Sequence, residues 1–368
     1  MHKPQKILIA HQGAQLYGSD HMVVQLSRAL QLNNQDSITI HLPHMGPLVD
    51  MLQGNVIFAP ISILRLSCLK NLQWLNIKDF YRNACFAWQQ MQQHDIVIVN
   101  TCVVLSYLFL MPFSQKRKFI YIHEIPTGII KWGFNILLRL TGATLICNSQ
   151  ATAKAYPFIP RSHKKIVYNA VPEPVTVTKR NASMSLQVLL IGRLSKRKGH
   201  QIVLQALNFI HRHTQHHFYL RIVGDSYNPQ STYTNELKEF VAEHGLDDFV
   251  SFYPFIAKPD EHYQWADIVI MASIQPESFG LVALEAMHHH CAVIASDIGA
   301  LPEIVRNLET GLLVQTGNIQ SLAQALVFYA EHPDKMIAHG AYGQKIAQDN
   351  FSIDHYQKQI NEIIHGTV

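Results

Sequence analysis

The sequence lacks any long hydrophobic run. Its longest apolar stretch, 103–113, contains a serine and a proline and falls well short of the roughly 18 residues that a membrane-spanning helix needs. The residues Met1–Gln5 are polar, and Ile7–Ala10 is too short for the apolar part of a signal peptide. We therefore expect a cytoplasmic protein without a membrane span.

Cysteine and charge are also scarce. The five cysteines are odd in number and scattered through apolar runs, which argues against a disulfide framework and fits free thiols in a reducing compartment. Only 15% of the residues are charged while 48% are hydrophobic, and this balance excludes a disordered chain. With 368 residues the chain is long for one domain and comfortable for two.

Short apolar runs alternate with amphipathic segments along the whole chain. This alternation predicts an α/β fold made of doubly wound, Rossmann-like parallel sheets. The predicted strands are Lys6–His11, Ile38–Leu42, Ile96–Val99, Phe119–Ile122, Thr144–Cys147, Leu186–Ile191, Phe218–Val223, Val250–Phe252, Ile268–Met271 and Ala292–Ala295. No Gly-x-Gly-x-x-Gly follows the first strand of either half, so the fingerprint of a pyridine-nucleotide enzyme is absent from the sequence.

One interruption of this alternation divides the chain. We expect a first domain over residues 1–171, a proline-containing linker over 172–185, a second domain over 186–350, and a final helix over 351–368 that crosses back to the first domain. Two such domains would face each other across a cleft, where ligands lie beyond the carboxyl ends of the strands. Candidate site residues are therefore those that follow predicted strands.

The most specific motif follows the strand Ile268–Met271. It reads Pro-Glu-Ser-Phe-Gly over 276–280 and runs into an apolar helical stretch that contains a second glutamate. Free backbone N–H groups at a helix start attract an anion, and glycine lets the anion approach closely. A carboxylate among apolar neighbours needs hydrogen-bond donors, which a pair of sugar hydroxyls would supply. The expected binding residues are Glu277, Ser278, Phe279, Gly280, Leu281 and Glu285.

A basic loop follows the strand Leu186–Ile191. It begins at Gly192, ends at Gly199 and holds four cations in between. Arg193 and Lys198 bracket a turn of a size that suits a diphosphate, because the guanidinium binds two oxygens at once and the ammonium acts as a point charge. We expect Gly192, Arg193 and Lys198 to bind phosphate.

Two weaker signals lie in the first half of the chain. His123 directly follows the strand Phe119–Ile122, where its ring would donate a hydrogen bond to a phosphate or sugar oxygen. Gly18, in the stretch 16–20, follows the first strand and opens a helix, a position that suits close approach of a phosphate or an acceptor.

Taken in order along the chain, these motifs resemble the retaining nucleotide-sugar glycosyltransferases of family 4, which have the GT-B fold. The resemblance is carried mainly by Glu277 and Glu285, spaced as E-x7-E, and by the loop 192–199. Further similar stretches are 148–149, 168–170, 223–225, 266–267, 299–303 and 310–314. The loop at Gly18 departs from the pattern, because the family often has Gly-Gly-x-Glu there and this chain has Tyr-Gly-Ser-Asp.

The resemblance implies a role for each site residue. Glu285 would bind the ribose hydroxyls of the donor, and Glu277 with the backbone behind it would hold the donor sugar. Arg193 and Lys198 would neutralise the diphosphate, and His123 would contact the transferred sugar or its phosphate. The catalytic residues would then be His123, Arg193, Lys198 and Glu277, and the product would keep the anomeric configuration of the donor.

We expect no cofactor and no metal ion. The Asp-x-Asp motif, which is the usual metal and donor signature of the other glycosyltransferase fold, does not occur. The histidine clusters at 211–217 and 288–290 lack a carboxylate-supported arrangement, and we interpret them as surface or helix-end residues. Fixed cations are expected to take the place of a metal at the leaving phosphate.

The predicted function is transfer of a sugar from a UDP- or GDP-linked donor to a glycan or lipid-linked acceptor, as in bacterial lipopolysaccharide or capsule synthesis. Two alternatives stay open: a sugar-nucleotide epimerase of GT-B fold, which turns over donor without acceptor, and a non-catalytic sugar-nucleotide-binding protein. Nucleic acid is not an expected partner.

Charge suggests where the acceptor lies. From Met1 to Ala170 the chain has 16 Lys and Arg against 6 Asp and Glu. From Val171 onward it has 14 Lys and Arg against 20 Asp and Glu. The stretch 129–140 combines large apolar residues, a tryptophan and two cations, as interfacial helices do. We expect an anionic, lipid-linked acceptor and peripheral contact with the inner face of the cytoplasmic membrane, with an ordinary core-packing helix as the alternative for 129–140.

Overall fold

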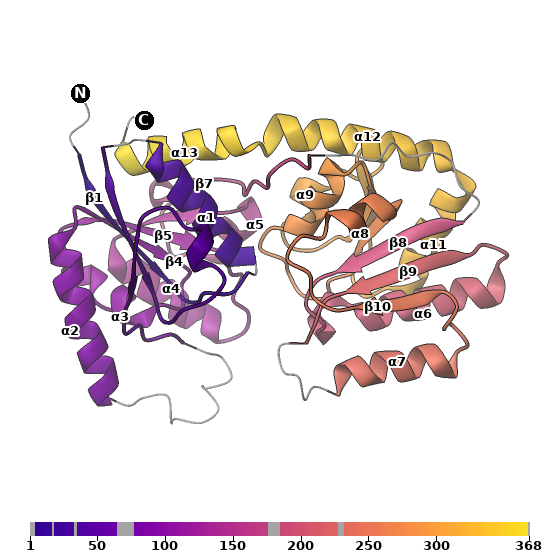
Figure 1. Cartoon of the computed structure of the whole chain (residues 1–368), viewed down its shortest axis with the longest axis horizontal. Coiled ribbons are helices and arrows are strands. Elements are labelled where there is room, and N and C mark those ends of the chain that lie inside the picture. The colour runs from indigo at the N-terminus through magenta and orange to yellow at the C-terminus, as the bar shows by residue number, and fades with distance from the viewer. Residues whose placement is uncertain are drawn as a thin grey trace. The chain divides into compact units, whose positions relative to one another are not determined.

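The computed structural model describes residues 4–16, 18–32, 35–64, 77–175, 185–226 and 232–366. Within them the chain forms two compact units (Figure 1). Unit 1 comprises Met1–Asn169 and Ile353–Val368, and unit 2 comprises Ala170–Ser352. Most of the predicted linker 172–185 lies outside the described residues.

Unit 1 is built on a seven-stranded sheet in the order β3-β2-β1-β4-β5-β6-β7, and all its pairs are parallel. Its strands are β1 (Lys6–His11), β2 (Ser37–Leu42), β3 (Asn55–Phe58), β4 (Ile96–Asn100), β5 (Arg117–Ile122), β6 (Thr144–Cys147) and β7 (Lys164–Ile166). Its helices are α1 (Gly18–Gln31), α2 (Ile77–Gln93), α3 (Leu105–Leu108), α4 (Ile130–Thr141), α5 (Gln150–Ala155) and α13 (Ile353–His365).

The core of unit 1 packs alternate residues of the central strands against α2, α3 and α4. Helix α13 packs along α1, and the Asn361 side chain donates a hydrogen bond to the Ala29 carbonyl at 2.8 Å. The last helix of the chain is therefore part of the unit that contains the first strand.

Unit 2 repeats this architecture with a six-stranded parallel sheet in the order β10-β9-β8-β11-β12-β13. Its strands are β8 (Leu186–Ile191), β9 (Phe218–Val223), β10 (Val250–Tyr253), β11 (Ile268–Met271), β12 (Ala292–Ser296) and β13 (Gly311–Val314). Its helices are α6 (His200–His213), α7 (Tyr233–Glu243), α8 (Asp260–Trp265), α9 (Leu281–His288), α10 (Leu301–Ile304), α11 (Ile319–Glu331) and α12 (Pro333–Asn350).

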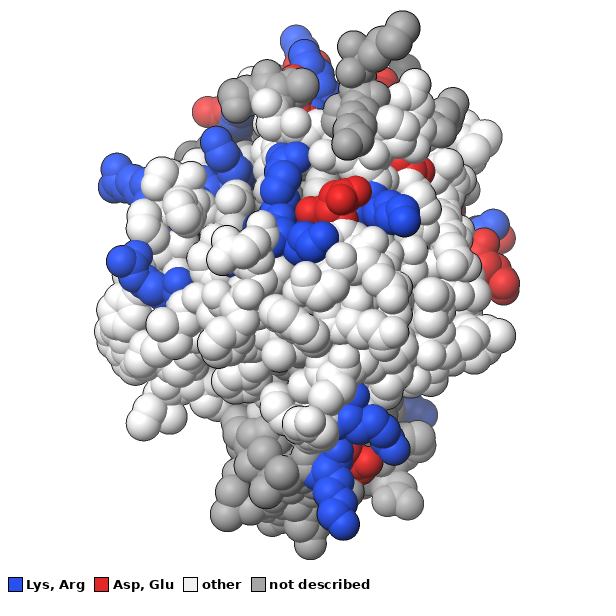
Figure 2. All heavy atoms as spheres, turned by 90° about the vertical axis from the view of Figure 1, so that its left-hand side faces the viewer, with Lys and Arg blue, Asp and Glu red and all other residues white. Residues whose placement is uncertain are grey.

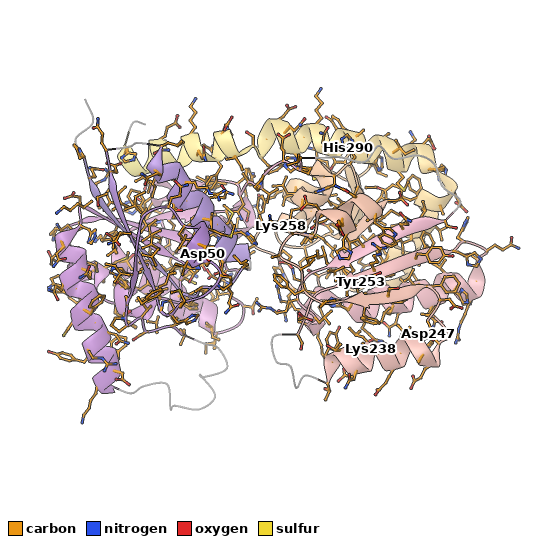
Figure 3. The ribbon with its side chains drawn as sticks, in the orientation of Figure 1. Asp50, Lys238, Asp247, Tyr253, Lys258 and His290 are labelled. Atoms are coloured by element: carbon orange, nitrogen blue, oxygen red, sulfur yellow. The ribbon has the colours of Figure 1, made fainter. Side chains whose placement is uncertain are left out.

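In unit 2 the residues of α6, α7 and α11 fill one core with the sheet, while α9 and α12 pack on β12. At the end of β10 the ring of Tyr253 (Figure 3) lies 5.2 Å from the guanidinium carbon of Arg221, which also lies 3.9 Å from the Trp265 ring. Arg221 belongs to β9, so this stack links β9 to the neighbouring edge strand β10 and to α8. A cation over two aromatic faces is favourable.

All ten predicted strands are present, five of them with the predicted bounds. Three strands were not predicted: β3, β7 and β13. Each of these three lies at an edge of its sheet. The prediction of two doubly wound parallel sheets is confirmed.

Charged side chains are scarce in the composition, and one face of the molecule shows where they gather. On the face drawn in Figure 2, Lys and Arg gather in a few places, some beside Asp or Glu, and broad areas between them bear no charge. The described helices include none that is long and apolar enough to cross a bilayer.

Candidate functional site

The site in unit 2 lies at the point where the strand order of the sheet reverses. Strands β8 and β11 are neighbours there, although three α-helices and two strands separate them in the chain. Ligands of doubly wound sheets bind at such switch points, beyond the carboxyl ends of the strands. The loop after β8 holds residues 192–199 and the loop after β11 holds residues 272–280, so both predicted motifs reach this edge of the sheet.

These two loops meet in an ion pair between predicted site residues. The Lys198 ammonium donates to Glu277 Oε1 at 2.7 Å, and the Ser273 hydroxyl donates to the same oxygen at 2.6 Å. The Arg197 guanidinium lies 3.3 Å from that oxygen. The structure thus brings Glu277 and Lys198 together and adds Arg197 and Ser273, which the sequence analysis missed.

The charge of Glu277 is fixed by its surroundings. Burial raises the pKa of this carboxyl, since it is only 8% exposed. The charges of Lys198 and Arg197 and the hydrogen bonds from Lys198 and Ser273 outweigh this effect and lower the pKa to about 2. Glu277 is therefore a carboxylate throughout the physiological range. Of the two cations expected to hold a diphosphate, Lys198 is thus paired with the acid expected to hold a sugar.

Two glycines make the close approach of these loops possible. Gly199 ends the turn Lys196–Lys198 with a φ of +74°, and a Cβ there would lie 1.9 Å from the Ala272 carbonyl oxygen. Gly299 has a φ of +63°, and a Cβ there would lie 2.4 Å from the Glu277 carbonyl oxygen. Both positions need left-handed backbone and no side chain, which only glycine offers at low cost.

Glu285, on the second turn of α9, has a partner of its own. The Tyr263 hydroxyl on α8 donates to Glu285 Oε2 at 2.5 Å. Burial raises the pKa of Glu285 to about 7; the hydrogen bond from Tyr263 lowers it, and Asp260 raises it again. The sequence analysis predicted that this acid needs hydrogen-bond donors but missed Tyr263, since the two residues lie on different helices.

The Tyr263 ring is itself held in place by a histidine of the 288–290 cluster. His289 stacks on Tyr263 with ring centroids 5.0 Å apart, and its Nε2 lies 3.5 Å from Asp260 Oδ1. His288 and His289 are 2% and 5% exposed, so they are buried although they lie at the end of α9.

The remaining predicted residues of unit 2 lie around this cluster. Gly192 and Arg193 begin the loop after β8, and Ser278, Phe279 and Gly280 precede α9, whose first residue is Leu281. The Phe279 side chain is 2% exposed and its ring lies 6.0 Å from that of Phe351, so this residue offers only its backbone to a ligand.

Unit 1 has its own polar cluster at the carboxyl ends of β1, β4 and β5, where its strand order also reverses. It contains the predicted His123 together with Asp20, His11 and Asn100. His11 Nε2 lies 2.7 Å from Asp20 Oδ1, and Asn100 Nδ2 lies 2.9 Å from His11 Nδ1. His123 Nε2 lies 2.8 Å from Asn100 Oδ1.

The chemistry of these contacts sets a direction for each hydrogen bond. An amide NH₂ only donates and an amide oxygen only accepts. Asn100 therefore donates to His11 Nδ1, which leaves the proton of His11 on Nε2, where it is donated to Asp20. At its other end Asn100 accepts the proton of His123 Nε2. His123 Nδ1 is then an acceptor, whereas the sequence analysis assigned His123 a donor role.

The His123 ring is also electrically neutral. Burial lowers the pKa of His123 to about 3, with a smaller contribution from nearby His11. Its backbone N–H donates to Glu124 Oε2 at 3.1 Å, and the Tyr121 ring lies 4.3 Å from it. The imidazole is therefore held rigidly in one tautomer and one charge state.

Gly18, the other predicted residue of unit 1, is exposed and begins α1. Asp20, in the first turn of the same helix, binds His11, so the start of α1 is tied to the cluster. Tyr17 lies outside the described residues.

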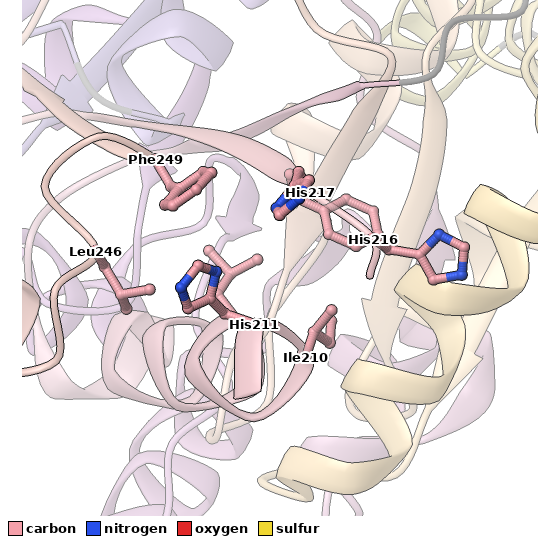
Figure 4. Close-up of a pocket in the computed structure, with 8 residues that line it drawn as sticks. Ile210, His211, His216, His217, Leu246 and Phe249 are labelled. Carbon is pink, nitrogen blue, oxygen red and sulfur yellow. The ribbon is translucent and has the colours of Figure 1, made fainter. Parts of the chain in front are cut away.

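The histidine-rich segment 211–217 lies elsewhere. His211 and His217 pack around Phe249 (Figure 4), with the His217 and Phe249 rings 5.6 Å apart and nearly parallel. The pocket between them has a volume of about 10 Å³, which is no more than one water molecule occupies. No group of three or more His, Cys, Asp or Glu among the described residues is placed to hold a metal ion.

Comparison with known proteins agrees with this geometry. The family model of glycosyl transferases group 1 matches residues 178–365, just over half of the chain. The lipopolysaccharide core biosynthesis mannosyltransferase LpcC of Rhizobium leguminosarum bv. viciae is 28% identical over 176 residues, which are 48% of this chain and 49% of that protein. The chain thus spans about half the length of the curated relatives it matches.

Solved structures match over nearly the whole chain. A glycosyltransferase from Rickettsia africae ESF-5 has a TM-score of 0.81 at 20% identity, covering 99% of this chain and 98% of that one. Anabaena Alr3699/HepE in complex with UDP-glucose has a TM-score of 0.79 at 21% identity, covering 98% and 100%. At these identities the likeness concerns the fold, two Rossmann-like units as in GT-B glycosyltransferases.

Proposed function

The chain belongs to the glycosyl transferases group 1 family, and from this premise we propose that it transfers a sugar from a UDP- or GDP-linked donor to a glycan or lipid-linked acceptor. The observation that carries the proposal is the cluster of Lys198, Arg197 and Glu277 at the switch point of unit 2, with Glu285 on the helix that follows. We assign the chain to the retaining enzymes of family 4, in which the product keeps the configuration of the donor.

Each group of the cluster has a part in this reaction. Glu285 binds the ribose hydroxyls, and Glu277 with the backbone of Ser278, Phe279, Gly280 and Leu281 holds the donor sugar. Breaking the anomeric C–O bond leaves negative charge on the departing diphosphate, so catalysis needs fixed positive charge there. Lys198 and Arg193, with Gly192 beside them, supply it, and for that reason we propose that the reaction needs no metal ion.

In unit 1, His123 contributes an acceptor to the transferred sugar, because its Nε2 proton is already given to Asn100. Gly18 at the start of α1 allows a phosphate or an acceptor to approach the backbone. We propose that the acceptor is anionic and lipid-linked. Its setting is the synthesis of a bacterial surface polysaccharide such as lipopolysaccharide or capsule, by an enzyme that is cytoplasmic and peripheral at the inner face of the membrane.

The test is a thermal-shift screen of the full chain against UDP, GDP, ADP, CMP and dTDP, followed by transfer assays with the sugar form of the nucleotide that binds. We expect a clear rise in melting temperature with UDP or GDP and sugar transfer that depends on acceptor. Conversion of the nucleotide sugar to its epimer in the absence of an acceptor favours the epimerase alternative. Binding without any turnover of donor favours the non-catalytic alternative.

A further inference from the structure

Helix α4 of unit 1 turns an apolar side outward. Ile129, Trp132, Ile136 and Leu140 are 86%, 50%, 54% and 63% exposed. Their spacing of three, four and four residues puts them on one side of the helix, since 3.6 residues make a turn. The opposite side, which includes Phe134 and Leu138, is buried in the core. The helix therefore packs normally on one side and leaves a hydrophobic stripe on the other.

A neighbouring segment widens this stripe. Phe158, which follows α5, is 41% exposed, and its ring lies 5.3 Å from that of Trp132. Arg139 donates to the Phe158 carbonyl at 3.2 Å, and the Phe158 N–H donates to Asn135 Oδ1 at 3.3 Å. These bonds fix the segment against α4. We call the surface formed by Ile129, Trp132, Ile136, Leu140 and Phe158 the α4 face.

The chain segment that carries the α4 face has charge of one sign only. Between Ile125 and Pro172 the sequence contains no Asp or Glu and six basic residues. These are Lys131, Arg139, Lys154, Arg161, Lys164 and Lys165. Lys131 and Arg139 belong to α4 itself, and Lys154 lies on α5, which Asn135 ties to α4 through a hydrogen bond to the Ala155 carbonyl at 3.2 Å. The hydrophobic stripe thus belongs to a stretch of sequence that contains basic residues and no acid.

We propose that the α4 face docks on an anionic lipid bilayer. An apolar stripe of this kind enters the boundary between headgroups and acyl chains. Tryptophan favours that boundary because one end of its ring is polar. Each basic residue near an anionic leaflet strengthens binding, so Lys131 and Arg139 of α4 and Lys154 of α5 favour negatively charged lipids. The inference deepens the proposed function, because a lipid-linked acceptor is presented at such a surface.

The experiment is co-sedimentation of the full chain with vesicles of phosphatidylglycerol and phosphatidylcholine, or of phosphatidylcholine alone, at low and high salt. We expect at least about tenfold stronger binding to the anionic vesicles at low salt, and loss of this difference at high salt, where exposed charges are screened. Equal or negligible binding to both kinds of vesicle at low salt overturns the proposal.

Two variants separate docking through α4 from general attraction to charge. Trp132→Ser combined with Ile136→Ser should weaken binding to anionic vesicles about tenfold, because both side chains leave the bilayer boundary. Trp88→Ser is the matched control, since Trp88 is a 37% exposed tryptophan on α2 of the same unit and should leave binding unchanged. Unchanged binding of the double variant overturns the proposal.

A second copy of the chain is the rival occupant of the α4 face. Sedimentation equilibrium that shows a wild-type dimer, and a monomer for the double variant, overturns docking on lipid. Donor binding separates failure of the docking proposal from failure of the proposed function. If a nucleotide still raises the melting temperature but the chain does not bind vesicles, docking alone is refuted. If the chain binds vesicles but no nucleotide raises its melting temperature, the proposed function alone is refuted.

Discussion

The two units bring polar residues to the same place in the same kind of sheet, yet they use opposite chemistry there. In unit 2 the switch point holds formal charges, with Lys198 and Arg197 around the Glu277 carboxylate. In unit 1 it holds a chain of hydrogen bonds in which Asn100 joins two imidazoles. The difference teaches that the same sheet topology can gather an ion-pair cluster at the switch point of one unit and a chain of hydrogen bonds at that of the other.

The largest effect should come from removing charge in unit 2. We predict that Lys198→Met lowers kcat/KM by about hundredfold or more, because a fixed cation at the departing phosphate is lost and Glu277 loses its nearest cation. Lys196→Met is the control, since Lys196 is two residues away, 75% exposed and paired only loosely with Glu236 at 3.7 Å. Steady-state kinetics of both variants measure the effect. Equal losses of kcat/KM in the two variants would contradict a specific role for Lys198, and with it the contrast drawn between the units.

The next effect concerns pH. Because the pKa of Glu285 is raised to about 7, the residue takes up a proton as the pH falls through that value, and a protonated carboxyl is a poorer acceptor for ribose hydroxyls. Donor affinity should therefore be highest above pH 7 and fall about tenfold from pH 8 to pH 6. Calorimetry with a nucleotide sugar, whose diphosphate diester does not titrate in this range, measures it.

Glu285→Gln gives the matched control for this pH dependence. The variant should bind the nucleotide sugar about tenfold or more weakly at pH 8, because a charge-assisted contact is lost, and its affinity should hardly change with pH. An unaltered slope in the variant would assign the pH dependence to another group.

A smaller effect should follow in unit 1, where no formal charge is removed. Asn100→Ala deprives His123 of its acceptor, so its ring exchanges between tautomers; we expect kcat to fall about tenfold with KM nearly unchanged. Long-range ¹H–¹⁵N spectra should show the His123 proton on Nε2 in the wild type and on both nitrogens in the variant. Asn135→Ala removes another buried asparagine of unit 1 and should leave the His123 signals in place.

The smallest effect is expected from chelation. If the cations of unit 2 replace a metal, turnover in EDTA should equal turnover without it. Activity that disappears in EDTA and returns with manganese or magnesium would show that the charges around Lys198 are insufficient.

The sequence predicted central strands well and edge strands poorly. The central strand β11, for example, is buried throughout and appears as a continuous apolar run. β3, β7 and β13 have three or four residues each, and β7 begins with two lysines. β3 and β7 are largely exposed, so their residues do not form an apolar run that distinguishes them from a loop, whereas β13 is buried but only four residues long.

Site residues within one sequence motif were predictable, whereas contacts between different strands or helices were not. Glu277 and Lys198 stand in recognisable loops, but three consecutive basic residues do not show which of them faces the acid. The short turn Lys196–Lys198 settles this in favour of Lys198 and Arg197. Asn100 was missed because its role depends on β4 lying between β1 and β5, which no local pattern reveals.

The ion pair between Lys198 and Glu277 has a consequence for selectivity. Inorganic phosphate and sulfate are abundant anions, and an empty basic loop would trap them. Here Glu277 already occupies the ammonium at 2.7 Å, so an anion must compete with an internal carboxylate for it. We expect only a ligand that also offers hydroxyl groups to Glu277 to make this exchange worthwhile. Under the proposed function, the hydroxyl groups of a sugar would bind Glu277 and free the Lys198 ammonium for the phosphate.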